Sequence, residues 1–224
     1  MDQSYQIRDG IGFARFEGRT IVLDVAADRY WQIGEDVGLA LEAIATGRVG
    51  VIDERALSRL ITRGFVVPAG DEPVRPSPNG CMPSPADSAL ERSILAGRPN
   101  WTTACEVMAL TLLARIALRA RPLKTVLDRL SARREGGRPK RPVPALEMLA
   151  QQFGQVRRLL PFRPLCLPDS IAFLWFAARR GHAPRLVFGV EAFPFTAHCW
   201  VQDGIMVLTD ALDHARQFKP ILVI

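Results

Sequence analysis

A proline-rich stretch about one third of the way along the chain is the sequence feature that most limits the fold. Five prolines lie between residues 69 and 88, together with glycine, serine and asparagine. Proline lacks a backbone N–H and has a fixed φ angle, so this composition disfavours a helix or an inner strand. We therefore predict a linker at 69–87, which separates a first domain at 1–68 from a second domain at 88–224.

The first domain has the pattern of a small α+β unit. Short runs of β-branched and aromatic residues predict strands, and apolar residues spaced three and four apart predict helices. In chain order we expect three strands, two helices and a closing strand, at 11–16, 20–24, 29–33, 34–46, 53–61 and 65–67. This order of elements indicates a winged-helix character.

The second domain begins with helical patterns and ends with strand patterns. We expect helices at 87–97, 101–120, 122–133, 144–160 and 168–180, then strands at 185–190, 196–202 and 205–210. Asp203 and Gly204 form a hairpin signal between the last two strands. Helices followed by neighbouring strands are typical of the α+β fold class.

Charge and composition exclude several function classes. Residues 1–70 hold 8 Lys and Arg against 10 Asp and Glu, although the whole chain has a net charge of +6. Nucleic-acid binding by a winged-helix unit needs a basic face, so we expect no nucleic-acid partner. The longest apolar stretch, 101–118, is interrupted by Glu106 and Arg115, which argues against a membrane span.

The remaining composition points to an intracellular enzyme without a metal or cofactor. The first residues show no basic start and no apolar core, so we expect no secretory signal and a cytoplasmic location. The four cysteines form no CxxC pair and are expected as free thiols. The three histidines are too scattered for a zinc site of known spacing.

Cys166 is the candidate nucleophile. Pro168 suits the first turn of a helix, which places Cys166 at the helix N-terminus. The helix dipole and the free N–H groups favour an anion there and lower the pKa of a thiol. A buried structural cysteine is the alternative reading of this residue.

His198 and Asp210 are the candidate base and orienting group. In a strand at 196–202, His198 shares a face with Trp200 and Gln202, whereas Cys199 points the other way. A loop centred on Gly204 would place His198 opposite Asp210, whereas a two-residue turn would place Thr209 there instead. Cys166 would then attack, His198 would move the proton, and Asp210 would fix the histidine tautomer.

Other residues are weaker candidates for this site. His182 falls in a loop between a helix and a strand, and His214 is expected on a surface helix or turn. The backbone N–H of Cys166 is the natural first oxyanion donor. A second donor is sought among three glutamines of the preceding helix, Gln151, Gln152 and Gln155.

The second domain resembles the lasso peptide biosynthesis B protein, a transglutaminase-like leader peptidase. The resemblance rests on the segments 166–172 (CLPDSIA), 181–184 (GHAP), 187–190 (VFGV), 194–201 (PFTAHCWV) and 218–222 (FKPIL), and on Asp210. It implies a papain-like or transglutaminase-like fold in which helices pack on a short antiparallel sheet. Asp169 departs from the family, which usually has a basic residue there, and we expect it to raise the thiol pKa slightly.

The first domain resembles the small leader-recognition domain related to the coenzyme PQQ synthesis D protein. The matching text is Leu23-Asp24, the segment 30–34 (YWQIG), and the helix from Asp53 to Gly64-Phe65-Val66. The resemblance implies that a leader peptide adds as a strand to an open sheet edge. The candidate leader-binding residues are Tyr30, Trp31 and Ile33 with Arg55, Leu57, Arg59 and Leu60 of the facing helix.

Together the two resemblances imply a cysteine peptidase that binds and removes the leader of a lasso precursor peptide. The expected partners are that precursor and a separate ATP-dependent cyclase, which closes a macrolactam on the freed N-terminus. Two alternatives stay open. The same residues could transfer the acyl group to an amine, as a transglutaminase or acyltransferase does. The chain could also be a leader-binding chaperone without catalysis.

Overall fold

The computed structural model describes residues 4–48, 52–70, 82–93, 97, 99–134 and 145–224. It divides into two compact units: Met1–Cys81 with Pro220–Leu222, and Met82–Lys219 with Val223–Ile224. Most of the predicted linker at 69–87 lies outside the described residues, because 71–81 are not described. The exact bounds of the linker predicted at 69–87 therefore remain a prediction.

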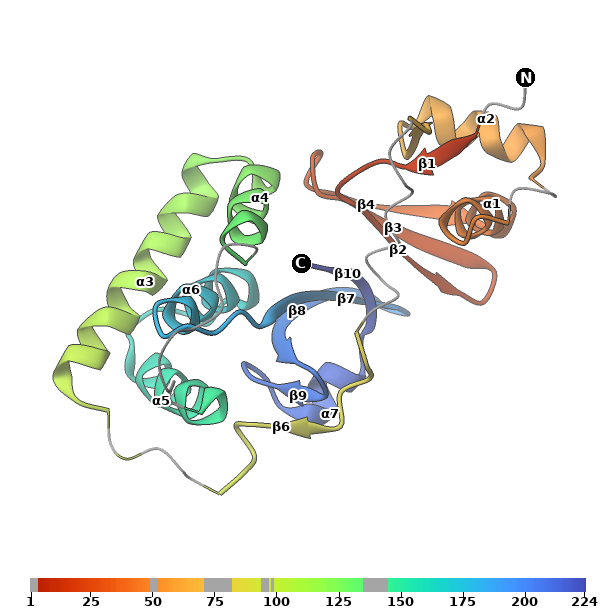
Figure 1. Ribbon diagram of the computed structural model, residues 1–224. Coiled ribbons are helices and arrows are strands. Elements are labelled where there is room, and N and C mark those ends of the chain that lie inside the picture. The colour runs from red at the N-terminus through yellow and green to blue at the C-terminus, as the bar shows by residue number, and fades with distance from the viewer. Residues whose placement is uncertain (1–3, 49–51, 71–81, 94–96, 98, 135–144) are drawn as a thin grey trace. The chain divides into compact units, whose positions relative to one another are not determined.

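The first unit combines two small sheets with two helices (Figure 1). Strands β2 (Ile11–Phe16), β3 (Arg19–Asp24) and β4 (Arg29–Gly34) form an antiparallel meander, with β4 at its edge. Strands β1 (Tyr5–Ile7) and β5 (Val66–Pro68) form an antiparallel pair, and the helices are α1 (Glu35–Ala45) and α2 (Glu54–Thr62). The elements predicted from sequence all occur within two residues of their expected ends, whereas β1 was not predicted.

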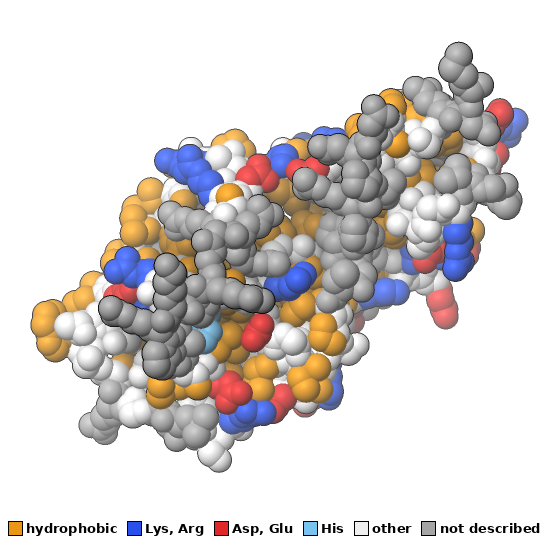
Figure 2. All heavy atoms as spheres, viewed as in Figure 1, with side chains coloured by type: hydrophobic (Ala, Val, Ile, Leu, Met, Phe, Trp, Pro, Cys, Tyr) orange, Lys and Arg blue, Asp and Glu red, His pale blue; other side chains and the backbone are white. Residues whose placement is uncertain are grey.

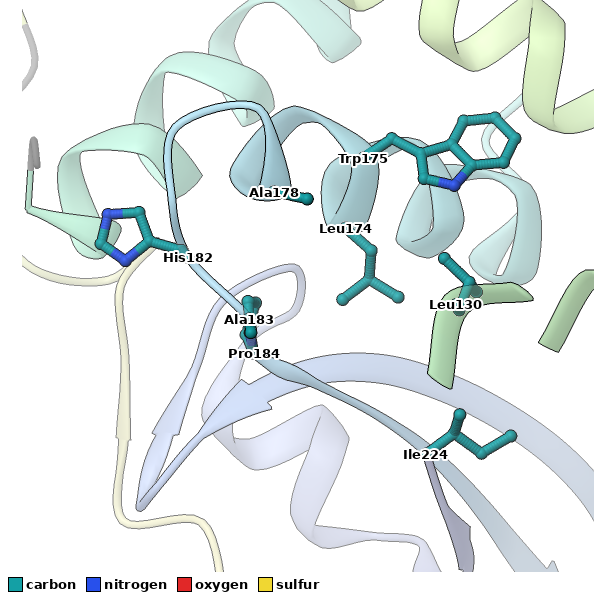
Figure 3. A pocket seen from close by; sticks show the side chains of 8 residues that line it. All are labelled: Leu130, Leu174, Trp175, Ala178, His182, Ala183, Pro184 and Ile224. Carbon is teal, nitrogen blue, oxygen red and sulfur yellow. The ribbon is translucent and has the colours of Figure 1, made fainter. Parts of the chain in front are cut away.

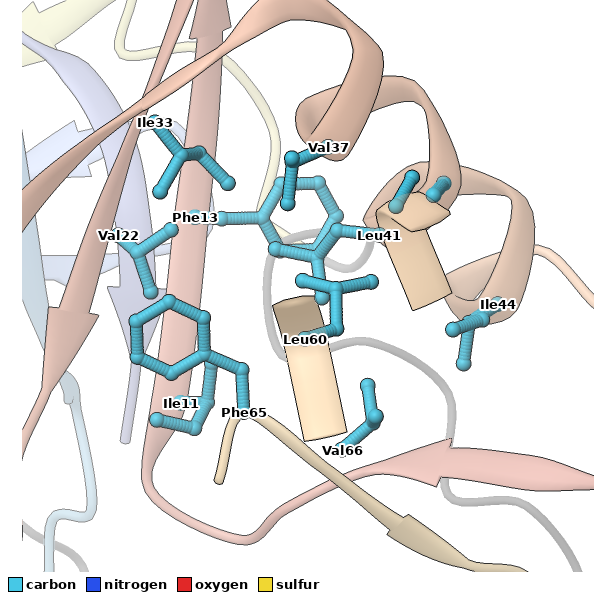
Figure 4. Close-up of a cluster of buried hydrophobic side chains, with 12 residues drawn as sticks. Ile11, Phe13, Val22, Ile33, Val37, Leu41, Ile44, Leu60, Phe65 and Val66 are labelled. Carbon is cyan, nitrogen blue, oxygen red and sulfur yellow. The ribbon is translucent and has the colours of Figure 1, made fainter. Parts of the chain in front are cut away.

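A single apolar core holds these elements together (Figure 4). Phe13 and Val22 project from the meander, Leu41 projects from α1, and Leu60 and Phe65 come from α2 and the residues after it. The helical spacing of the apolar residues in α1 puts them on one face, and Asp53 caps α2 by accepting a hydrogen bond from the Ala56 N–H at 3.2 Å.

The second unit places a helical layer beside a five-stranded sheet (Figure 1). Its helices are α3 (Trp101–Ala120), α4 (Leu123–Arg134), α5 (Leu146–Leu159), α6 (Cys166–Ala178) and α7 (Leu212–Arg216). Its strands are β6 (Asp87–Ser88), β7 (Arg185–Ala192), β8 (Phe195–Asp203), β9 (Met206–Val207) and β10 (Lys219–Val223), in the order β10-β7-β8-β9-β6. This is a mixed α/β arrangement, and α6 packs against both α3 and β8.

The helix predicted at 87–97 is wrong over the described residues 87–93. Asp87 and Ser88 instead form β6, which runs parallel to β9, and a turn follows. The buried Ser88 hydroxyl donates to the Asp210 carbonyl at 2.7 Å and accepts from the Leu90 N–H at 3.2 Å. These bonds satisfy the backbone outside a helix, so side-chain capping and strand pairing override the helical pattern.

The strand predicted at 205–210 is shorter than expected. Strand β9 ends at Val207, and the last backbone hydrogen bond to β8 is from the Leu208 N–H to the Val201 carbonyl. Beyond it, Thr209 Oγ1 accepts the Val201 N–H at 2.9 Å in place of a backbone carbonyl. The chain then turns into α7. This departure from the ladder decides where Asp210 lies.

Helix α3 carries apolar side chains on its surface as well as in the core (Figure 2). By length and composition α3 could cross a membrane. The most apolar 18-residue segment within it has a mean hydropathy of 1.4, and 22% of that segment is buried in the structure. One such helix is weak evidence, since core helices pass the same test. The exposed large apolar residues of this helix are Trp101, Met108, Leu112, Leu113 and Ile116.

Candidate active site

Cys166 is the first residue of α6, which begins two residues before its predicted start at 168, so the predicted place of Cys166 at a helix N-terminus is confirmed. Leu165 is the N-cap and has extended backbone, and Pro168 lies in the first helical turn. The Asp169 carboxylate accepts the Leu165 N–H at 3.0 Å, which caps the helix from inside. Most of the rest of α6 is buried in the core. Cys166 is exposed at the N-terminal end of this helix.

The buried Arg157 of α5 fixes the segment that leads to Cys166, and sequence reasoning missed it. Its guanidinium donates to the carbonyls of Phe162 and Arg163 at 3.1–3.2 Å and pairs with Asp169 at 2.8 Å. Asp169 is not among the groups that shift the pKa of Cys166; it pairs with Arg157 and instead helps to raise the pKa of Cys199. No sequence pattern marks an arginine of this kind.

His198 contacts Asp210, although by a different register from the one expected. The β8–β9 pairs are Gln202 with Val207 and Asp203 with Met206. Continued regularly, this register would put Ala211 opposite His198, so the predicted direct pairing with Asp210 is wrong. Because the ladder ends early, the Asp210 carboxylate still reaches the ring, with Oδ2 at 2.5 Å from His198 Nε2.

Aromatic side chains fix the plane of the His198 ring. Trp200, fully buried, stacks beside it with a centroid separation of 6.1 Å and an interplanar angle of 20°, and Phe218 lies at 5.0 Å. The Trp200 indole donates to Gln202 at 2.9 Å, so the predicted shared face of β8 is confirmed. Gly189 pairs with His198, and a Cβ there would come within 2.7 Å of Phe218 and Trp200. Only glycine leaves room for this packing.

The electrostatics of the site favour a thiolate and an imidazolium. The pKa of Cys166 is lowered to about 4. A hydrogen bond from the Cys199 thiol contributes most to this shift, burial opposes it, and the contact with His198 adds to it. Burial works against the charged form of His198, but Asp210 and Cys166 outweigh it and raise its pKa to about 9. Burial likewise opposes ionisation of Asp210, yet His198 and His214 lower its pKa. Since Nε2 faces Asp210, Nδ1 is the nitrogen left for Cys166.

Cys199 is a donor to the nucleophile and not a second nucleophile. It is buried, and its contact with the Cys166 thiolate together with burial raises its pKa well above the ordinary thiol value. Its backbone N–H also bonds to the Cys166 sulfur. Strand alternation predicts that Cys199 points away from His198, but it does not reveal that Cys199 faces the mouth of α6.

His214 is exposed on a short helix, which confirms its expected place on a surface helix or turn, and it also contacts the site. It lies on α7, and its Nδ1 is 2.7 Å from the same Asp210 Oδ2 that contacts His198. The ring centroids of the two histidines are 4.6 Å apart. The spacing of Asp210 and His214, four residues apart on an expected helix or turn, is the sequence signal that could have revealed this contact.

His182 and Gln151 are placed elsewhere. His182 lines a small cavity of about 50 Å³ at the other end of α6, with Leu174, Trp175 and Pro184 (Figure 3). A larger groove of about 740 Å³ lies between α3, α4 and α6, also near Trp175. The Gln151 amide donates to the carbonyls of Ala89 and Ser93, so its use as an oxyanion donor is wrong. Gln152 and Gln155 remain candidates from sequence.

In the first unit, the structure separates the predicted leader-binding residues by burial. Trp31 is 37% exposed on the edge strand β4 and meets the Phe65 ring edge-on at 6.4 Å, and Tyr30 is half-buried. Ile33 and Leu60 are 3% and 0% exposed and belong to the core. Their predicted contact with a peptide is therefore wrong in this structure, because the apolar core already covers them.

Helix α2 presents the other predicted residues. Arg55 is exposed, Arg59 is exposed and pairs with Asp36 at 3.1 Å, and Leu57 is half-buried against the core. Arg55, Arg59 and Trp31 therefore offer side chains to solvent, and the edge of β4 offers backbone groups. An extended peptide could pair with such an edge.

Comparison with known proteins gives one match. The family model described as the transglutaminase-like superfamily matches residues 108–223, which include Cys166, His198 and Asp210. Searches of the curated proteins and of the solved structures gave no match. The matched segment covers more than half of the chain and leaves residues 1–107 outside it.

Proposed function

This chain belongs to the transglutaminase-like superfamily, and we propose that it is the cysteine peptidase that removes the leader from a ribosomally made lasso precursor peptide. The superfamily includes cysteine peptidases and acyltransferases. The observation that carries the proposal is the contact chain from the Cys166 thiol through His198 to Asp210, with 2.5 Å between the last two groups. The reaction would take place in the cytoplasm, where such precursors are made.

The first half of the reaction follows from these contacts. The Cys166 thiolate attacks the scissile carbonyl carbon, and His198 Nδ1–H gives its proton to the leaving nitrogen. The C–N bond breaks, the core leaves with a free amine, and the leader stays on sulfur as a thioester. Asp210 stabilises the imidazolium before the proton moves and fixes the ring through Nε2.

The second half returns the site to its starting state. Neutral His198 takes a proton from water, and the resulting hydroxide attacks the thioester carbon. The C–S bond breaks, the leader leaves as a carboxylic acid that gives its proton to the solvent, and thiolate and imidazolium are restored. Hydrolysis of this kind requires no cofactor, and the freed core amine is the substrate that the proposed ATP-dependent cyclase needs.

Leader recognition is assigned to the first unit in this proposal. The leader would add as a strand beside β4, where Trp31 and Tyr30 supply alternate side-chain contacts and Arg55 and Arg59 attract acidic leader residues. A chaperone without catalysis would not need a nucleophile whose pKa is lowered to about 4, so this observation favours an enzyme.

The test is cleavage of the cognate precursor peptide in H₂¹⁸O, followed by mass spectrometry. Wild-type protein should release a leader that carries one ¹⁸O atom, Cys105→Ala should behave alike, and Cys166→Ala should give no product. Cys105 is the matched control because it is an exposed free thiol on α3.

Three other results would contradict the proposal. Transfer of the leader to an added amine without ¹⁸O would identify an acyltransferase. Cleavage by Cys166→Ala would remove the assigned nucleophile. Binding without cleavage, even with the cyclase and ATP present, would identify a chaperone.

A further inference from the structure

Three ligand atoms of the second unit converge on one point beside the nucleophile. His198 Nε2 and His214 Nδ1 lie 2.5 Å and 2.7 Å from the same oxygen, Asp210 Oδ2. All three atoms lie within 4.8 Å of one another. The contact chain of the proposed reaction uses only two of these groups, so His214 is left without a part in the chemistry.

We propose that His198, Asp210 and His214 form a binding site for a divalent transition-metal ion such as Zn²⁺, which inserts among them and switches the peptidase off. Two imidazoles and one carboxylate are a zinc ligand set, whereas Ca²⁺ and Mg²⁺ prefer oxygen ligands. The metal site does not depend on the proposed function; only the switching effect rests on it.

The geometry needs only a small adjustment to hold the ion. Ligand atoms about 2.0–2.1 Å from a tetrahedral zinc lie about 3.3 Å from one another, within the 4.8 Å span found here. Asp210 Oδ1 accepts the Ala211 N–H at 2.8 Å, which holds the carboxylate while Oδ2 turns to the ion. The open fourth position would take water.

The site is reachable from solvent. The side chain of His214 is 47% exposed, whereas His198 and Asp210 are 16% and 18% exposed. The exposed ligand can therefore take up the ion first, and the two partly buried ligands can complete its coordination. Phe218 packs against both histidine rings, with ring centroids 5.0 Å apart for His198 and 5.4 Å apart for His214. This packing keeps the two rings facing the same carboxylate.

Metal binding would stop catalysis by changing what His198 can donate. The ion replaces the proton on Nε2, so the ring is no longer an imidazolium. The proton on Nδ1 then belongs to a neutral metal-bound imidazole, which is a far weaker acid, and transfer to the leaving amine fails. The ion also takes Asp210 away from the histidine.

The test measures metal binding in the full-length chain carrying Cys166→Ala, so that neither the nucleophile nor turnover contributes. Zn²⁺ is titrated by calorimetry, and Co²⁺ by its visible spectrum. We expect one ion per chain. Adding His214→Gln, which keeps a hydrogen-bonding side chain but removes the ligand, should weaken affinity at least tenfold, since loss of outer-shell partners alone costs about 10–100-fold. Adding His182→Ala should change nothing.

Equal affinity with and without His214, or no one-to-one binding to the Cys166→Ala chain, would overturn the proposal. A site made from cysteines would give the first result, because Cys81, Cys105 and Cys199 are present in every variant. A failed cleavage assay would not affect this measurement, so the two proposals fail independently. In active protein, the zinc concentration for half-inhibition should rise at least tenfold in His214→Gln.

Discussion

At the scale of single residues, Asp210 controls the protonation of His198. Asp210→Asn removes the carboxylate that helps to raise the histidine pKa to about 9. We expect kcat/KM to fall by about 10³–10⁴-fold, as when other triads lose this charge, and the alkaline limb of the pH profile to move to lower pH. Asp213→Asn on the exposed face of α7 is the control. An unshifted alkaline limb would exclude the assigned role.

Cys199 controls the ionisation of the nucleophile Cys166 through a hydrogen bond. Cys199→Ala removes the thiol hydrogen bond that contributes most to the low pKa of Cys166. The acid limb of Cys166 alkylation should therefore move to higher pH, while the backbone N–H of residue 199 still supports part of the effect. Measured against Cys105→Ala, an acid limb that stays in place would show that the Cys199 thiol is not a donor.

Single residues also show where sequence reasoning ends. Cys166 and His198 stand out because a helix start and a strand pattern give each a position and a direction. Arg157 and Cys199 act through contacts between different elements, and His214 acts through a side-chain contact that its expected surface position did not indicate. Such contacts depend on packing angles, which periodicity does not encode.

At the scale of elements, β6 holds the loop that carries Asp210. The Ser88 hydroxyl is fully buried and donates to the Asp210 backbone carbonyl. Ser88→Ala should lower the free energy of unfolding by about 1–2 kcal/mol, because the Asp210 carbonyl and the Leu90 N–H lose their partner. Denaturant unfolding would measure it, with the exposed Ser131→Ala as control. Equal stability of the two variants would contradict the role given to β6.

Long periodic elements were predicted well, and short ones were not. The twenty-residue α3 has the predicted bounds, because the Asn100 side chain caps its start and Pro122 follows its end. The two-residue strands β6 and β9 and the five-residue helix α7 carry too few residues for a period to appear. The last part of the site is built on these short elements, so the register around Asp210 could not be predicted from sequence.

At the scale of the whole molecule, the proposal separates recognition from chemistry. Trp31→Ala should raise KM for the precursor about tenfold, the size expected for a modest aromatic anchor, and leave kcat unchanged. Leu39→Ala removes a similarly exposed apolar side chain from α1 and serves as control. A lower kcat with the same KM would place Trp31 in the chemistry and not in recognition.

The proposed peptidase activity requires above all that Cys166 is a thiolate held by His198. The most direct measurement is the pH dependence of iodoacetamide alkylation at Cys166 and Cys105, followed by peptide mass spectrometry. Cys166 should reach its full rate above a pH of about 4–5, and His198→Ala should move that limb upward. If Cys166 gains reactivity only together with Cys105, the activated nucleophile does not exist.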